Sequence, residues 1–125
     1  MKRMVLESWL LLLYFDLVMN EGDFKALHDT VRKHKVSPLI RNTSRSAEAL
    51  CHAVDLACVF YFKPVMCLQR SATTVLLLRR YGWNAEMVIG VQEVSFKSHA
   101  WVEIGGTIVN DKPYMLDIYQ VLERC

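Results

Sequence analysis

The chain has 125 residues, of which 53% are hydrophobic and 22% charged, and its formal net charge at pH 7 is +2. This apolar content excludes an intrinsically disordered chain and is enough for one domain with a substantial core. The net charge is too small to indicate a nucleic-acid-binding protein, so we expect no nucleic acid among its partners.

The first segment is predicted to form a helix over about residues 4–20. Its apolar run Trp9–Phe15 is bracketed by Glu7 and Asp16, which lie too close together for a bilayer span. No small-residue cleavage site follows the basic start, so we predict no secretory signal. Helical spacing predicts that the inward face consists of Leu6, Leu10, Leu13, Leu17 and Val18. We therefore expect a buried helix and no membrane span.

Two further helices are predicted before residue 63. The second has an N-cap at Asp23, runs to about Lys35 and ends at Ser37-Pro38. Its predicted inward residues are Phe24, Leu27 and Val31. The third covers about residues 46–62, and its predicted inward residues are Leu50, Val54, Ala57 and Cys58.

A basic cluster lies at Arg32–Lys35, with Arg41 and Arg45 nearby. Such a run of charges usually forms a solvated face. Binding of an acidic partner or peptide is the alternative interpretation.

The stretch Cys67–Gly82 is the centre of the predicted fold. The residues that repeat at helical spacing on one face are Leu68, Ala72, Val75 and Leu76. Two more leucines make the helix apolar nearly all round, which is typical of a helix buried in the middle of a domain. Two arginines suit its last turn, and Gly82 suits the position just past its end. Because Pro64 interrupts any helix arriving from upstream, Cys67 falls in the first turn of a new helix.

After this helix the pattern changes to the alternation that is typical of strands. Strands are predicted at 85–91, 99–104 and 107–109, and the last two are joined by a turn at Gly105-Gly106. The segment 114–121 is predicted to be either a further strand or a short helix. The order of elements predicts the α+β class, with N-terminal helices packed on a small antiparallel sheet. No linker or internal repeat is evident, so we expect a single domain over residues 1–125.

A cysteine, a histidine and an acid or amide form the candidate active site. At a helix start, free backbone amides and the helix dipole favour a thiolate, so Cys67 is the candidate nucleophile. His99, at the beginning of a strand, is the candidate general base. Either Asn110 or Asp111, at the end of the next strand, suits the third position, because amides and acids both orient imidazoles.

The register of the hairpin distinguishes these two. A two-residue turn at Gly105-Gly106 pairs Trp101 with Asn110, which puts Asn110 on the His99 face and turns Asp111 away. A three-residue turn or a one-residue bulge exchanges the two faces.

The remaining cysteines and histidines are interpreted as structural. Cys51 and Cys58, on the third helix, are interpreted as small buried hydrophobic residues. The cysteines lack the close pairing of a zinc site, and no cofactor or metal is expected. The other histidines, predicted to be surface or core residues, are His28, His34 and His52.

The aromatic residues and the oxyanion hole are less well defined. Trp101 and the segment Tyr81–Trp83 are interpreted as core residues in preference to the lining of a substrate groove. The backbone amide of Cys67 is a natural oxyanion donor at a helix start. Gln69 is too close to Cys67 along the helix to supply the second donor.

The segments CLQRSATTVLLLRRYGWNAEMVIGV and HAWVEIGGTIVND together resemble the transglutaminase-like cysteine peptidases of lasso peptide biosynthesis. Those enzymes remove the leader from a ribosomally made precursor. The resemblance covers roughly residues 47–111. It implies a papain/transglutaminase-like fold in which Cys67 is the nucleophile, His99 the base and Asp111 the orienting acid.

Because the resemblance favours the acid over the amide, we expect an odd-length turn or a bulge near Gly105-Gly106. Such a turn would bring Asp111 to His99. A regular two-residue turn with Asp111 facing away would contradict this hypothesis.

The resemblance also implies partners. These are a precursor peptide and a separate ATP-dependent lasso cyclase. No winged-helix-like stretch of strands precedes the helices, so we expect a separate leader-recognition protein as well. With this much apolar content the chain needs no disulfides, and we expect a reduced, cytoplasmic protein. The alternatives are an acyltransferase of transglutaminase or arylamine acetyltransferase type, and a non-catalytic scaffold that presents precursor to a cyclase.

Overall fold

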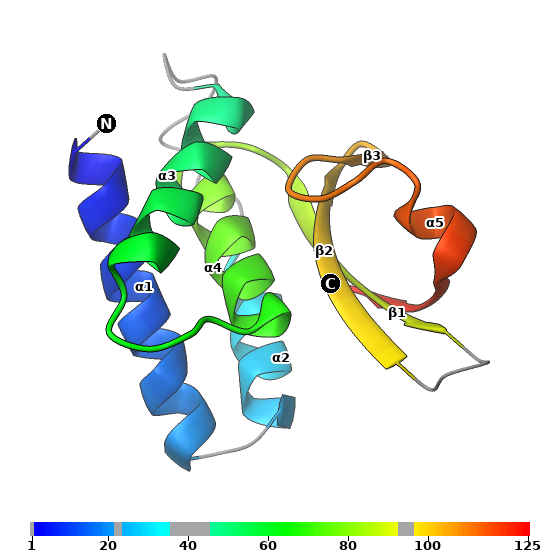
Figure 1. Ribbon diagram of the computed structural model, residues 1–125, viewed down its shortest axis with the longest axis horizontal. Helices are drawn as coiled ribbons and strands as arrows, with labels where there is room; N and C mark the ends of the chain where they lie inside the picture. The colour runs from blue at the N-terminus through cyan, green and yellow to red at the C-terminus, as the bar shows by residue number, and fades with distance from the viewer. Residues whose placement is uncertain (1, 22–23, 36–45, 93–96) are drawn as a thin grey trace.

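The computed structural model describes residues 2–21, 24–35, 46–92 and 97–125, and its helices pack against a small sheet (Figure 1). In chain order the elements are α1 (Lys2–Glu21), α2 (Phe24–Lys33), α3 (Ala47–Phe60), α4 (Cys67–Arg80), β1 (Ala85–Gln92), β2 (Lys97–Ile104), β3 (Thr107–Ile108), α5 (Met115–Ile118) and β4 (Gln120–Arg124). The prediction of an α+β fold is confirmed, and the segment 114–121 contains both a short helix and the start of a strand. Among the described helices, none combines the length and the apolar character that crossing a membrane requires.

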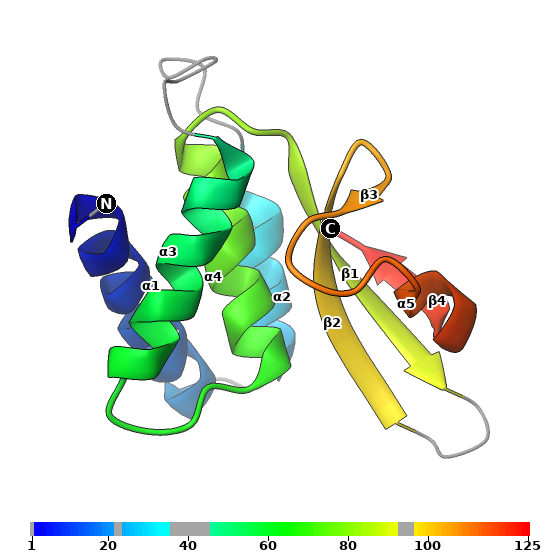
Figure 2. The same ribbon diagram turned by 45° about the horizontal axis from the view of Figure 1, so that its top comes forward.

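Helix α4 lies between the α1–α3 pair and the sheet (Figures 1 and 2). It contacts α1, α2 and α3, and it also contacts β1 and β2. Every residue from Ser71 to Arg79 is buried, as the nearly continuous apolar pattern predicts. Burying one leucine side chain contributes about 2 kcal/mol to folding. Because α4 buries its side chains against both the helices and the sheet, this burial holds the two layers together.

The buried face of α1 differs from the predicted face. Three of its five predicted inward residues are exposed, namely Leu6 (60%), Leu10 (52%) and Leu17 (56%). The helix buries Leu12 and Phe15 instead, together with the polar Ser8 and Asp16. Because α1 is apolar on nearly all sides, its leucines alone do not identify the inward face.

Asp16 is satisfied inside the protein by residues that follow α3. Its carboxylate accepts a hydrogen bond from the Tyr61 hydroxyl and lies 2.8 Å from Lys63 Nζ. Burial alone would raise the pKa of Asp16, but hydrogen bonds from Lys63, Tyr61 and Gln69 outweigh it, and the pKa is lowered. A buried polar residue with such partners is compatible with a core.

Helices α2 and α3 follow their predictions closely. Leu27 and Val31 of α2 are fully buried, as are Leu50, Val54 and Ala57 of α3. The Ser46 side chain caps α3 by accepting a hydrogen bond of 3.1 Å from the amide of Ala49. Helix α2 ends at Lys33, and the predicted boundary residues Asp23, Ser37 and Pro38 lie outside the described residues.

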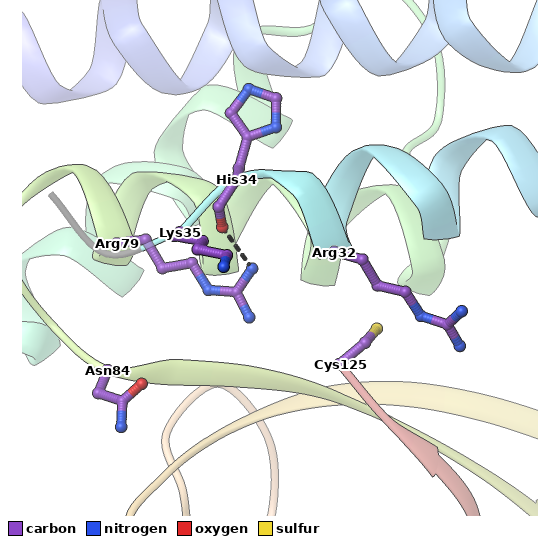
Figure 3. A pocket seen from close by; sticks show the side chains of 6 residues that line it. All are labelled: Arg32, His34, Lys35, Arg79, Asn84 and Cys125. Carbon is purple, nitrogen blue, oxygen red and sulfur yellow. Dashed lines mark hydrogen bonds between the residues drawn. The ribbon is translucent and has the colours of Figure 1, made fainter.

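Arg79 joins the ends of α2 and α4 to the first strand. Its Nη1 donates to the carbonyl of His34 at 2.8 Å (Figure 3). Nη1 also donates to the carbonyl of Val31 at 2.6 Å, and Nε donates to that of Ala85 at 3.0 Å. Burial lowers the pKa of this guanidinium. The last carbonyls of a helix have no partner within the helix, so Arg79 serves as the C-terminal cap of α2.

Replacing Arg79 with Lys is expected to lower the free energy of unfolding by about 2–4 kcal/mol, because an ammonium does not reproduce the fork of three hydrogen bonds. Urea unfolding monitored by circular dichroism measures the change. Arg80→Lys is the matched control, since Arg80 is 59% exposed and its nearest acid, Glu7, is 3.9 Å away. We expect the control to change stability by less than about 0.5 kcal/mol. Equal losses in both variants would contradict the capping role.

The strands form one antiparallel sheet in the order β3-β2-β1-β4. Ile104 pairs with Thr107, so the turn between β2 and β3 has two residues. These are Gly105 and Gly106, with φ of 56° and 83°. Two consecutive positive φ values define a type I′ turn, which glycine adopts at least cost.

Both faces of the sheet are covered. Ala100 and Val102 belong to the core that β2 shares with α4. On the opposite face Trp101 is fully buried, which confirms it as a core residue, and its Nε1 donates to Glu103 Oε2 at 2.9 Å. Helix α5 lies on the side of the sheet away from α1–α4 (Figures 1 and 2). Tyr119, directly after α5, packs on Trp101 with ring centres 6.1 Å apart.

Candidate active site

Cys67 is the first residue of α4, in the helix start where the sequence predicts it. Met66 before it is extended and gives no side-chain cap, and the amide of Arg70 closes the first turn on the Met66 carbonyl at 2.9 Å. The Cys67 side chain is half-buried and packs against the main core. Because Cys67 begins α4, its side chain lies at a helix N-terminus, where the helix dipole favours negative charge.

The other three cysteines are in environments that disfavour thiolates. Burial is the largest cause in each case, and it raises the pKa of Cys51 to about 11. Burial also raises the pKa of Cys58 and Cys125. All four cysteines are free thiols.

The structure brings His99 and Asp111 together. His99 Nε2 lies 2.5 Å from Asp111 Oδ2, and the two side chains are 25% and 16% exposed. The other carboxylate oxygen, Oδ1, accepts a hydrogen bond of 2.8 Å from the amide of Lys112. Because both oxygens have partners, the carboxylate is fixed beside the imidazole.

The route by which Asp111 reaches His99 differs from the predicted one. The hairpin turn is a regular two-residue turn, so the expected odd-length turn or bulge is wrong. Strand pairing instead ends just past β3. The amide of Val109 still donates to the Val102 carbonyl at 2.9 Å, but the amide of Val102 donates to the side chain of Asn110 at 2.7 Å. The side-chain amide replaces the next ladder bond, and the chain bends at residues 109–111, where Asp111 meets His99.

Asn110 connects the hairpin to α4 and does not contact His99 in the described structure. Its Nδ2 lies 3.4 Å from Ser71 Oγ, which in turn donates to the Ala100 carbonyl at 3.0 Å. The Asn110 carbonyl accepts a hydrogen bond of 3.1 Å from Arg70. Sequence reasoning did not identify Ser71 and Arg70, because no local pattern marks a bond between a helix and a distant hairpin.

These bonds place Cys67 and His99 at the same end of the contact between α4 and β2. Ser71 is one helical turn after Cys67, and its partner Ala100 directly follows His99. Both elements begin at this end of the molecule (Figures 1 and 2). The strand alternates, so the Ala100 side chain packs toward α4 while the His99 ring lies beside Trp101 and Tyr119.

Other polar candidates have structural contacts. Gln69 donates to the Leu12 carbonyl at 2.8 Å, so its amide is engaged away from any oxyanion. His28 lies 3.3 Å from Glu123, and His34 Nδ1 lies 2.8 Å from the Thr30 carbonyl. Within the described ranges, no group of three or more His, Cys, Asp or Glu side chains is arranged to hold a metal ion.

The predicted basic cluster lies at the other end of α4. Arg32, His34 and Lys35 line a cavity of about 520 Å³ together with Arg79, Asn84 and Cys125 (Figure 3). Arg32 forms an ion pair with Glu123. Arg41 and Arg45 lie outside the described residues.

Comparison with known proteins supplies a family and a relative. Residues 10–124 match the family model described as the transglutaminase-like superfamily. Over 56 residues the chain is 41% identical to the microcin J25-processing protein McjB of Escherichia coli. That alignment covers 45% of this chain and 27% of McjB, so the match spans about a quarter of the relative. No solved structure matches the chain.

Proposed function

Because the chain belongs to the transglutaminase-like superfamily, we propose that it is a cysteine peptidase that removes the leader peptide from a lasso peptide precursor. The contact between His99 Nε2 and Asp111 Oδ2 is the observation that carries the proposal. Cys67 supports it from the start of α4, at the same end of the contact between α4 and β2. The similarity to a protein named for processing microcin J25 supports a peptide substrate.

In the proposed mechanism the Cys67 sulfur attacks the carbonyl carbon at the end of the leader. Because Nε2 of His99 donates its proton to the Asp111 carboxylate, Nδ1 is the ring nitrogen that takes the thiol proton. The backbone amide of Cys67, at the start of α4, donates to the oxygen that becomes negative. When the C–N bond breaks, His99 returns the proton to the leaving amine, and the leader remains on sulfur as a thioester.

Water then completes the reaction. His99 removes a proton from the water molecule as its oxygen attacks the thioester carbonyl, and the sulfur leaves as a thiolate that regains the proton. Asp111 keeps the proton of the neutral imidazole on Nε2 through both steps. The products are a leader with a free carboxylate and a core peptide with a free amine.

The proposal also covers partner proteins, the cellular compartment and the extent of the domain. A separate leader-recognition protein presents the precursor, an ATP-dependent cyclase uses the released amine, and residues 1–125 act as one cytoplasmic peptidase domain.

Transfer of the acyl group to an amine is the second candidate function, because the family takes its name from that chemistry. A new amide product in place of a carboxylate distinguishes it.

Alkylation of the four cysteines with iodoacetamide tests the nucleophile without a substrate. At pH 7.5 we expect Cys67 to react at least about tenfold faster than the others, and His99→Ala to remove most of that advantage. Cys51, whose pKa is about 11, is the internal reference, and its rate should rise only as the pH approaches that value. Mass spectrometry of peptic digests measures each site.

His52→Ala is the matched control, because His52 is an exposed histidine on α3. It should leave the Cys67 rate unchanged. A Cys67 that reacts as slowly as Cys51 would contradict the peptidase proposal.

A further inference from the structure

The imidazole of His99 is held on its ring face as well as at its edge. The Tyr119 ring lies nearly parallel to it, with centroids 5.5 Å apart and an angle of 25° between the planes. Trp101 lies on the same face of the sheet, with its ring centre 6.2 Å from that of His99. Together His99, Trp101 and Tyr119 form a three-ring cluster between β2 and the segment after α5.

Gly90 allows this cluster to form. It pairs with His99 across β1 and β2, and with Val121 across β1 and β4. A Cβ atom at Gly90 would lie 2.7 Å from Trp101 Cη2 and 2.8 Å from Tyr119 Cβ. Both distances are shorter than carbon atoms tolerate, so only glycine lets the two rings approach the strand.

A hydrogen bond at one nitrogen leaves the imidazole free to tilt about that bond. A stacked ring restricts the tilt, because the two faces stay in contact only while the planes remain nearly parallel. Misplacing a reacting group by about 1 Å can reduce a catalytic rate by about a hundredfold. Restricting the plane of His99 therefore has a catalytic consequence.

We infer that Tyr119 is a positioning residue for His99, acting through ring stacking at a site that Gly90 keeps open. The inference rests on the proposed function for its catalytic consequence, but the positioning itself is a property of the folded chain. No local pattern in the sequence marks Tyr119, since its contact is with a strand about 20 residues earlier.

Cys67 alkylation by iodoacetamide is the first readout. We expect Tyr119→Ala to lower the rate at pH 7.5 by about tenfold, toward the rate of His99→Ala, and Tyr119→Phe to retain the wild-type rate. Tyr114→Ala is the control, because Tyr114 belongs to the same segment and is 49% exposed. Gly90→Ala is expected to act like Tyr119→Ala. Thermal unfolding confirms that each variant is folded.

A double-variant cycle separates positioning from general loosening of the structure. If Tyr119 acts through His99, adding Tyr119→Ala to His99→Ala changes the Cys67 rate no further. An equal loss in both backgrounds would overturn the inference. So would a folded Tyr119→Ala variant with the wild-type rate.

Nuclear magnetic resonance of the His99 ring gives a readout that does not depend on Cys67. At pH 8 the wild type and Tyr119→Phe should show one set of ring ¹⁵N signals with the proton on Nε2, whereas Tyr119→Ala should show averaged signals of both tautomers. Unchanged signals in Tyr119→Ala would refute the positioning role. If these signals change as expected while wild-type Cys67 is unreactive, only the proposed peptidase function fails.

Discussion

Replacing Cys67 with Ala is expected to reduce leader removal by at least about 10⁴-fold, because no other group takes the place of the attacking sulfur. The assay is mass spectrometry of a lasso precursor incubated with the protein and the proposed leader-recognition partner. Cys58→Ala is the matched control, since it removes a thiol that burial keeps protonated. It should retain cleavage.

Two outcomes would contradict the peptidase proposal in different ways. Normal maturation of the precursor by the Cys67→Ala variant would indicate a scaffold that presents precursor to a cyclase. An amide product that requires both Cys67 and an added amine would indicate acyl transfer. Either outcome would leave the description of the fold unchanged and would replace the proposed hydrolysis with another function.

Replacing Asp111 with Asn is expected to lower kcat by about 10²–10⁴-fold with little loss of stability, because an amide that donates to Nε2 favours the wrong imidazole tautomer. Steady-state cleavage of the precursor gives kcat and KM, and urea unfolding gives the stability.

The neighbouring Asn110→Ala variant provides the contrast. It leaves the Val102 amide without its partner and removes the contact to Ser71, so it should lower the free energy of unfolding by about 1–3 kcal/mol. Any loss of cleavage should follow the loss of folded protein. A stable Asn110→Ala variant without activity, beside an active Asp111→Asn variant, would assign the orienting role to Asn110.

The sequence predicted the elements of the fold well where local signals are strong. Pro64 and Gly82 mark the limits of α4, and the period changes from helical to alternating at residue 85. Ser46 marks the start of α3 through its side-chain cap. These signals depend on the physical chemistry of a few adjacent residues, so a single chain displays them.

Features that depend on distant partners were not predictable in the same way. The inward face of α1 contains Asp16 because Tyr61 and Lys63 satisfy it, and nothing within α1 indicates that they will. The pairing of His99 with Asp111 agrees with the expected contact, but it arises from a bend stabilised by the Asn110 side chain and not from an altered turn. Tyr119 was not identified because its role depends on a contact across the sheet.

The bond between Asn110 and Ser71 joins residues 39 positions apart in the chain. During synthesis the helix that carries Cys67 therefore leaves the ribosome well before Asn110. A nascent chain that has formed its helices but has not yet docked its hairpin holds the thiol without the imidazole and the carboxylate that the proposed mechanism assigns to it. In the proposed mechanism the thiol therefore gains its base and orienting acid only when the last long-range contacts form.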